Sequence, residues 1–132
     1  MSRHLLDTDV LIDYSKGREP AVARIREMLD QGDDLGVCAV NVAEFFAGVP
    51  PDDRAYWRTV FSTLTYWPIS RAAAERAGMW RKEYSLRGQT LSTADALTAA
   101  VAVEHGAALV TRNAKDYPMP ELRLTVLGSE GR

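Results

Sequence analysis

The sequence predicts an α/β fold, namely a three-layer α/β/α sandwich with a central, mainly parallel sheet of four or five strands. Short apolar stretches alternate with segments of helical periodicity along the whole chain, which is typical of strands and helices joined by right-handed crossovers. The stretch LGVCAV at 35–40 is apolar throughout, as strands are in a parallel sheet covered on both faces. The length of 132 residues suits one domain with one hydrophobic core.

The first half of the chain is divided by residues that start or stop helices. Gly17 ends the first helix, and Pro20 suits the first turn of the second. Asn41 is a good N-cap, and Gly48 ends the helix that it begins. In chain order we expect a strand at 3–6, a helix at 10–17, a helix from Pro20 to a turn at 32–34, a strand at 35–40 and a helix at 41–48.

The second half continues the alternation. The stretch VPPDD at 49–53 breaks the chain and opens a helix with apolar residues at helical spacing. Pro68 marks the next strand as an edge strand or a strand end, and Gly106 stops a helix rich in small apolar residues. In order we expect a helix after residue 53, a strand at 65–69, a helix at 70–86, a helix at 93–106, a strand at 107–111, a loop at 112–120 and a strand at 122–127.

Composition indicates an ordinary globular protein. Hydrophobic residues make up 46% of the chain and charged residues 26%, and the formal net charge of −2 argues against a strongly basic nucleic-acid-binding surface. No apolar run reaches the ~18 residues of a membrane span, and the N-terminus lacks a signal-peptide pattern. We therefore expect a cytoplasmic protein without membrane contact, one domain over 1–132 with a loose tail at 128–132, and a core role for Cys38.

Five acidic residues fall at corresponding places of the predicted elements. Asp7 and Asp9 follow the first strand, and Glu44 lies one helical turn after the second. Asp95 lies in the first turn of a buried helix, and Asp116 follows the strand at 107–111. Because ligands bind where the carboxyl ends of parallel strands meet, all five can reach one edge of the sheet.

Taken singly, these residues have ordinary explanations. Asp9 suits the N-cap of the helix at 10–17, and Asp95 follows Ser92 by three residues, the spacing of a helix cap. Asp7 is harder to explain, because it continues an apolar strand and has no basic neighbour in the sequence.

Taken together, the carboxylates predict a bound cation. At ~5 Å and an effective dielectric constant of ~20, each pair would repel by about 3 kcal/mol, which a divalent ion removes. Oxygen ligands suit Mg²⁺ or Mn²⁺, whereas two His and one Cys without ligand spacing argue against zinc. One or two such ions are suited to phosphoryl transfer, because they lower the pKa of a water and stabilise the leaving oxygen.

Three stretches in this order and spacing resemble a known family. They are LLDTDVLIDY at 5–14, VNVAEFFAG at 40–48 and TADALTAAVAVEHGAALVTRNAKDY at 93–117, and the resemblance extends over nearly the whole chain. They are similar to PIN-domain ribonucleases of the VapC toxin type, and the last stretch is the most specific. The resemblance implies a PIN-domain-like form of the predicted sandwich.

The resemblance also assigns roles to the acids. It implies that Asp7, Glu44 and Asp95 are catalytic metal ligands. In the wider family the fourth acid lies in the segment matching TRN, where this chain has Asn113, with Asp116 three residues later. Either side chain can fill the fourth role: Asn113 by its amide oxygen or a held water, Asp116 by its carboxylate.

Five further residues are given auxiliary roles. Asp9 stands where the family often has Asn, so we expect a helix cap or an outer-shell group. Thr8, Ser92 and Thr111 are candidates for hydrogen bonds to phosphates or to metal ligands, and Arg112 for contact with the RNA backbone or for a solvated loop charge.

The function implied by the resemblance is a metal-dependent endoribonuclease that cuts tRNA or rRNA and so inhibits translation. Members of the family are toxins that often form homodimers. A cognate VapB-type antitoxin blocks the acidic site, and operator DNA is contacted only through that antitoxin.

Two alternatives to a nuclease stay open, and a third fits the sequence poorly. A PIN-like chain that binds its partner without cutting RNA would also fit an incomplete fourth acid. Asp7-Thr8-Asp9 also matches the D-x-D of haloacid-dehalogenase-type phosphatases, with Asp7 as nucleophile, but the later acid pair of such sites is missing. A receiver-like signalling domain fits poorly, because VPPDD at 49–53 is no strand.

Overall fold

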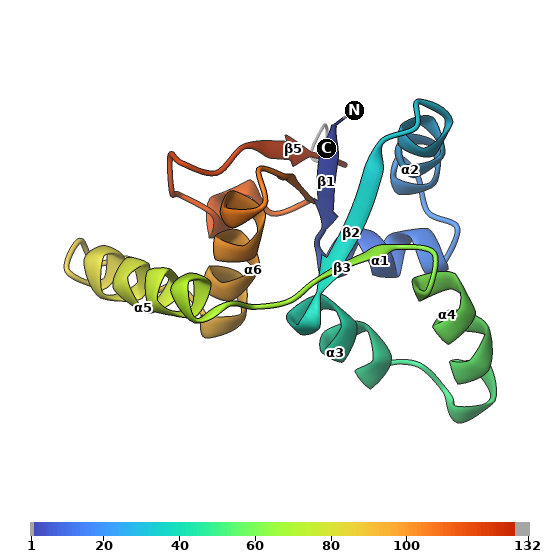
Figure 1. Cartoon of the computed structure of the whole chain (residues 1–132), viewed down its shortest axis with the longest axis horizontal. Coiled ribbons are helices and arrows are strands. Elements are labelled where there is room, and N and C mark those ends of the chain that lie inside the picture. Colours follow the sequence, from blue (N-terminus) through green and yellow to red (C-terminus); the bar gives the residue numbers. More distant parts are fainter. Residues whose placement is uncertain (1, 129–132) are drawn as a thin grey trace.

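A computed structural model describes residues 2–128 and contains one five-stranded sheet (Figure 1). All neighbouring strands are parallel, in the order β3-β2-β1-β4-β5. The predicted fold class is therefore confirmed. The strands are β1 (Arg3–Leu6), β2 (Asp34–Cys38), β3 (Thr65–Trp67), β4 (Ala108–Thr111) and β5 (Leu124–Val126).

Helices cover both faces of the sheet. In Figure 1, α5 and α6 lie on one side of the strands and α1, α2 and α4 on the other, with α3 directly after β2. The helices are α1 (Thr8–Ser15), α2 (Ala21–Asp30), α3 (Ala39–Ala47), α4 (Arg54–Phe61), α5 (Arg71–Ser85) and α6 (Thr93–Glu104), with 3-10 turns η1 (Pro51–Asp53) and η2 (Ala114–Asp116).

Two apolar clusters follow from the alternation of side chains along the strands. Leu5 and Leu109 pack into the cluster formed with α5 and α6, whereas Leu6 and Val110 pack into the cluster formed with α1 and α2. All four side chains are at most 1% exposed. The predicted core position of Cys38 is confirmed, because this side chain is fully buried.

The middle of the sheet fixes the edge that carries the acids. Leu5 pairs with Gly36 of β2 and with Leu109 of β4, so the three central strands run in step. The backbone N–H of Asp7 then donates to Val110 at 2.9 Å, which extends the pairing by one residue beyond β1. Asp7 and the residues after β4 consequently meet at the same edge.

Two predicted helix starts are wrong. The N-cap of α1 is Asp7 rather than Asp9, because the Thr8 N–H donates to Asp7 Oδ1 at 2.9 Å and the helix starts two residues earlier. Helix α3 starts at Ala39 rather than 41, since the buried Asn41 side chain accepts the Cys38 N–H at 3.0 Å from inside the first turn. Strand β2 accordingly ends at Cys38, before the predicted residue 40.

The remaining boundaries agree more closely. Strand β3 is an edge strand that ends before Pro68, as expected, and β5 is shorter than the predicted 122–127. The expected loose tail at 128–132 lies, apart from Gly128, outside the described residues. Within 2–128 no helix has the length and apolarity needed to cross a membrane.

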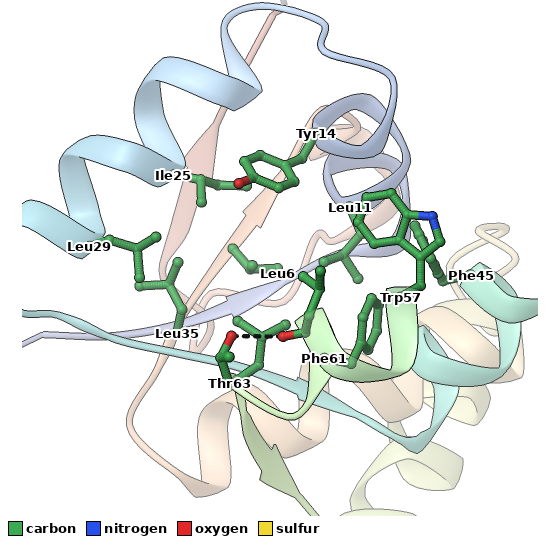
Figure 2. Close-up of a pocket in the computed structure, with 12 residues that line it drawn as sticks. Leu6, Leu11, Tyr14, Ile25, Leu29, Leu35, Phe45, Trp57, Phe61 and Thr63 are labelled. Carbon is green, nitrogen blue, oxygen red and sulfur yellow. Dashed lines mark hydrogen bonds between the residues drawn. The ribbon is translucent and has the colours of Figure 1, made fainter. Parts of the chain in front are cut away.

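A small apolar groove with a volume of about 80 Å³ lies between α1, α2 and α4. Figure 2 shows Ile25 and Leu29 of α2 pointing toward the space that Leu11 of α1 and Trp57 and Phe61 of α4 face from the other side. Leu29 is 53% exposed at this groove although it is apolar. The lining is completed by Leu6, Tyr14, Leu35, Phe45, Val60, Thr63 and Leu64.

Candidate metal centre

Asp7 occupies the end of β1 and is the most buried acid of the predicted site, with 8% exposure. Its Oδ1 accepts the Thr8 N–H at 2.9 Å, and its Oδ2 accepts the hydroxyls of Thr111 and Tyr117, both at 2.8 Å. Burial raises the pKa of Asp7, the three hydrogen bonds lower it, and the nearby charge of Glu44 adds to the rise. A carboxylate has about four acceptor positions, so one remains on Oδ1 for a cation.

Tyr117 connects the first acid to the third. Its hydroxyl also lies 3.2 Å from Oδ1 of Asp95, so Asp7 and Asp95 lie on either side of one phenolic oxygen. Burial and then the negative charges of Asp7 and Asp95 raise the pKa of Tyr117 far above its usual range. The hydroxyl therefore stays protonated and serves the two carboxylates as a donor.

Asp95 lies in the first turn of α6, as predicted. The Ser92 hydroxyl accepts the Asp95 backbone N–H at 3.0 Å, which confirms Ser92 as the cap of this helix. Partial burial raises the pKa of Asp95, and the charges of Asp7 and Asp116 add to that rise. Asp116 in η2 is therefore near enough to act electrostatically on this carboxylate.

Glu44 reaches the site from α3. The Thr8 hydroxyl donates to its Oε1 at 2.6 Å, and the side chain is exposed. Because Thr8 also donates its backbone N–H to Asp7, one residue at the start of α1 binds both acids. The structure thus brings Asp7, Glu44, Asp95 and Asp116 to the same edge of the sheet.

Asp9 has a different environment from Asp7. Its Oδ2 accepts the backbone N–H of Arg112 at 3.1 Å and the side-chain amide of Asn113 at 2.8 Å, and the Thr111 hydroxyl lies at 3.5 Å. Burial and the charge of Asp7 raise the pKa of Asp9 to about 6. Asp9 therefore connects α1 to the segment after β4, and the amide nitrogen of Asn113 is used in this contact.

The donor set fits a hydrated Mg²⁺ or Mn²⁺. Among residues 2–128, no three His, Cys, Asp or Glu side chains are grouped closely enough to hold an ion by themselves. Mg²⁺ typically keeps several waters and binds one or two carboxylates, so the pair of Asp7 and Asp95 suits it. Burial first, and the neighbouring acids to a smaller degree, raise the pKa of both carboxylates, so a cation beside them would favour their charged forms.

Two residues of this region were absent from the sequence prediction. Tyr117 lies in the predicted loop at 112–120, and its only signal was an aromatic residue directly after Asp116. Asp13 is 4% exposed in α1 and accepts Arg112 Nη1 at 2.7 Å. Its signal was a second acid one helical turn after Asp9 in an otherwise apolar helix.

Comparison with known proteins shows the family of this chain. The family model described as "PIN domain" matches residues 4–118. Ribonuclease VapC19 of Mycobacterium tuberculosis is 26% identical over 120 residues, which cover 90% of this chain and 96% of that protein. Among solved structures, a toxin–antitoxin complex from Klebsiella pneumoniae is 28% identical with a TM-score of 0.71, covering 93% of this chain and 96% of the other.

A further solved structure shares the fold at lower identity. VapBC2 from Rickettsia felis, bound to a DNA fragment from its promoter, is 21% identical with a TM-score of 0.82, covering 96% of this chain and 99% of the other. The family model spans most of the chain and includes Asp7, Glu44, Asp95 and Asp116. The structure over these residues is a parallel sheet with acidic side chains at its carboxyl edge. Because the family model matches residues 4–118, the chain belongs to the PIN domain family.

Proposed function

We propose that the protein is a metal-dependent endoribonuclease and the toxin of a VapBC-type toxin–antitoxin pair. One observation carries this proposal: Asp7 and Asp95 share the hydroxyl of Tyr117 at the carboxyl edge of the sheet, with Glu44 bound to the neighbouring Thr8. Membership of the PIN domain family and the likeness to a ribonuclease support it.

The chemistry rests on four acids. Asp7 and Asp95 would hold the principal Mg²⁺ or Mn²⁺, and Glu44 and Asp116 would hold a second ion or orient the attacking water. A bound ion supplies a water of lowered pKa and positive charge for the 3′-oxygen that leaves. Tyr117 keeps its proton and fixes the carboxylates on either side of it.

The substrate that we propose is cellular RNA, and tRNA or rRNA in particular, so that cleavage inhibits translation. The overall charge of −2 leaves little general attraction for a polyanion. Recognition therefore depends on local contacts around the site, which is consistent with cleavage at restricted positions rather than general degradation of RNA.

The proposed partner is a cognate VapB-type antitoxin, with a homodimer of the toxin in the complex. Several solved structures of this fold are complexes of a toxin with its antitoxin, and two of the complexes described as VapBC are bound to DNA. We propose that operator DNA is contacted only through the antitoxin. The apolar groove with exposed Leu29 suits an apolar segment of that partner, so Leu29→Glu is expected to weaken the complex.

Cleavage assays on purified tRNA and rRNA test the activity. We expect cleavage with Mg²⁺ or Mn²⁺, none with EDTA, and none for Asp7→Asn or Asp95→Asn. Asp9→Asn is expected to cause only partial loss, since Asp9 supports the loop rather than the ion. Asp30→Asn is the control, because Asp30 is an exposed acid at the end of α2, on the opposite edge of the sheet. Unchanged cleavage in both Asp7→Asn and Asp95→Asn would overturn the metal assignment.

Two other outcomes identify the alternatives. Tight partner binding without cleavage of any RNA, including RNA whose ends are sequenced after expression in cells, would favour a protein that only binds its partner. Turnover of small phosphate esters with a phosphorylated Asp7 would favour a phosphatase instead.

A further inference from the structure

Asp13 is a buried acid that the proposed chemistry does not use. It is 4% exposed in α1, and both of its oxygens face arginines: Oδ2 lies 2.7 Å from Arg112 Nη1 and Oδ1 lies 3.4 Å from Arg18 Nη1. Buried carboxylates are rare unless they are paired, so this side chain serves as an anchor for the two cations.

Arg112 is held at two points by the same helix. Its backbone N–H donates to Asp9 at 3.1 Å, and its guanidinium donates to Asp13, which lies one helical turn further along α1. Arg112 directly follows Thr111, whose hydroxyl donates to Asp7. The guanidinium is thereby fixed beside the acidic edge.

The anchored arginines still face solvent. The side chain of Arg112 is 43% exposed and that of Arg18 is 56% exposed, although each contacts the buried Asp13. A guanidinium carries five N–H donors, and within residues 2–128 each of these two makes a single hydrogen bond. The remaining donors form a planar fork of the kind that binds phosphate.

The charge around the site explains why such a fork is needed. Four carboxylates at one edge repel an RNA strand, and the protein as a whole is mildly acidic. Cations at the rim attract the backbone phosphates that flank the bond to be cut. A flexible side chain would lose rotamer freedom on binding, whereas an anchored arginine has already lost it.

We propose that Asp13 is a positioning residue that holds Arg112 and Arg18 at the rim of the acidic site, where the two guanidiniums bind phosphates of the RNA backbone. This inference rests on the proposed function. The alternative is that the Asp13 contacts only fasten α1 to the segment after β4, in which case the arginines touch no phosphate.

The salt dependence of RNA binding separates these two roles. On single strands, each phosphate contact contributes about 0.7 to the slope of log K against log salt concentration, and a purely structural contact contributes nothing. The probe is a fluorescein-labelled, mixed-sequence single-stranded 12-nucleotide RNA, measured by anisotropy with Ca²⁺ in place of Mg²⁺. Folding of each variant is checked by its thermal melt.

Arg112→Gln and Arg18→Gln are the main variants, because glutamine keeps an N–H donor for Asp13 without the positive charge. We expect each to reduce the slope by about 0.7 and the pair to reduce it by about 1.4. Arg123→Gln is the matched control, since Arg123 is exposed and donates to Gly106 at the opposite edge of the sheet. It is expected to leave the slope as in the wild type.

Asp13→Asn tests the positioning role itself. In the wild-type background it is expected to reduce the slope toward that of the double arginine variant, and in the double variant to change nothing further. The inference would be overturned if Arg112→Gln and Arg18→Gln lower the slope no more than the control Arg123→Gln does. This outcome can be read even if Asp13→Asn fails to fold. If that result accompanies metal-dependent cleavage, the proposed nuclease stands without the arginine contacts. Absence of both RNA binding and cleavage in the wild type would overturn both.

Discussion

The hydroxyl of Tyr117 is the donor that Asp7 and Asp95 share, and its removal tests whether the site is held together as described. Tyr117→Phe deletes the oxygen that lies 2.8 Å from Asp7 Oδ2 and 3.2 Å from Asp95 Oδ1. Tyr117 is 3% exposed, and the phenylalanine ring keeps the packing of the tyrosine ring. The two carboxylates then face each other with one donor fewer.

The expected loss follows from the charge of the acceptors. A hydrogen bond to a charged group contributes about 1.5–3 kcal/mol, and one between neutral groups about 0.5–1.5 kcal/mol. Tyr84 provides a matched control, because it is 4% exposed and its hydroxyl donates to the neutral carbonyl of Pro118 at 3.3 Å. Tyr117→Phe is therefore expected to lower the free energy of unfolding by about 1.5–3 kcal/mol in EDTA, more than Tyr84→Phe does.

Urea unfolding at neutral pH measures both variants. In excess Mg²⁺ the deficit of Tyr117→Phe is expected to shrink, because the cation supplies the positive charge that the hydroxyl dipole supplied. The deficit of Tyr84→Phe is expected to stay the same. If Tyr117→Phe costs no more than Tyr84→Phe in EDTA, the shared hydroxyl does not stabilise the pair of carboxylates, and Tyr117 does not hold the site together.

Three further predictions concern stability. Because burial and the charge of Asp7 raise the pKa of Asp9 from 3.8 to about 6, the metal-free folded state binds that proton more tightly than the unfolded chain does. Relative to Asp9→Asn, the wild type should gain up to roughly 3 kcal/mol as the pH falls from 7 to 4, and a constant gap in urea unfolding would contradict this. Gly36→Ala should lower the free energy of unfolding by about 1–3 kcal/mol, because a Cβ there would lie 2.6 Å from the Trp67 ring. Gly78→Ala should raise the free energy of unfolding by about 0.5–1 kcal/mol, because Gly78 has a helical backbone and open space around it. Thermal melts of the two variants measure both effects. Mg²⁺ at 100 times its Kd should stabilise the wild type by about 2.7 kcal/mol. Asp95→Asn should have a higher Tm than the wild type without metal, but should lose most of the stabilisation by Mg²⁺. Equal stabilisation of the two proteins by Mg²⁺ would contradict the metal assignment.

The convergence of the acids was predictable because it depends on topology alone. Once the strands are parallel, residues that follow β1 and β4 must meet at one edge, whatever the details of the loops. Asp7 and Asp116 needed only the strand positions, and Asp95 needed only the start of α6. The sheet order with β1 between β2 and β4 then brings these residues together.

The local roles of Asp7 and Asp9 were not predictable in the same way. Both residues are good N-caps, and the choice between them depends on where the sheet pairing stops. The Asp7 N–H still bonds to Val110, so Asp7 is at once the last residue of the sheet ladder and the cap of α1. Asn41 was misjudged for a related reason, since a side chain at the third helical position satisfies the cap from inside the helix.

The missed residues depend on contacts between distant parts of the chain. Tyr117 reaches Asp7 across 110 positions, and Arg112 reaches Asp13 across 99. No periodicity or spacing within a window of one or two helical turns carries such information. A second acid in an otherwise apolar helix and an aromatic residue after an acid were the only traces, and both patterns have ordinary explanations elsewhere.

The chain places neutral donors where a cation would otherwise be required. Thr8 donates to Glu44, and Thr111 and Tyr117 donate to Asp7, so each hydroxyl offsets negative charge without adding positive charge. The pKa values of Asp7 and Asp95 nevertheless stay raised, chiefly because burial desolvates both carboxylates and to a smaller degree because other acids lie nearby. The cost of keeping these carboxylates charged while they are buried near other acids destabilises the metal-free fold and, by linkage, strengthens the binding of a cation that offsets it. Stability without metal and affinity for metal are therefore set by the same side chains and change in opposite directions when one of the acids is neutralised.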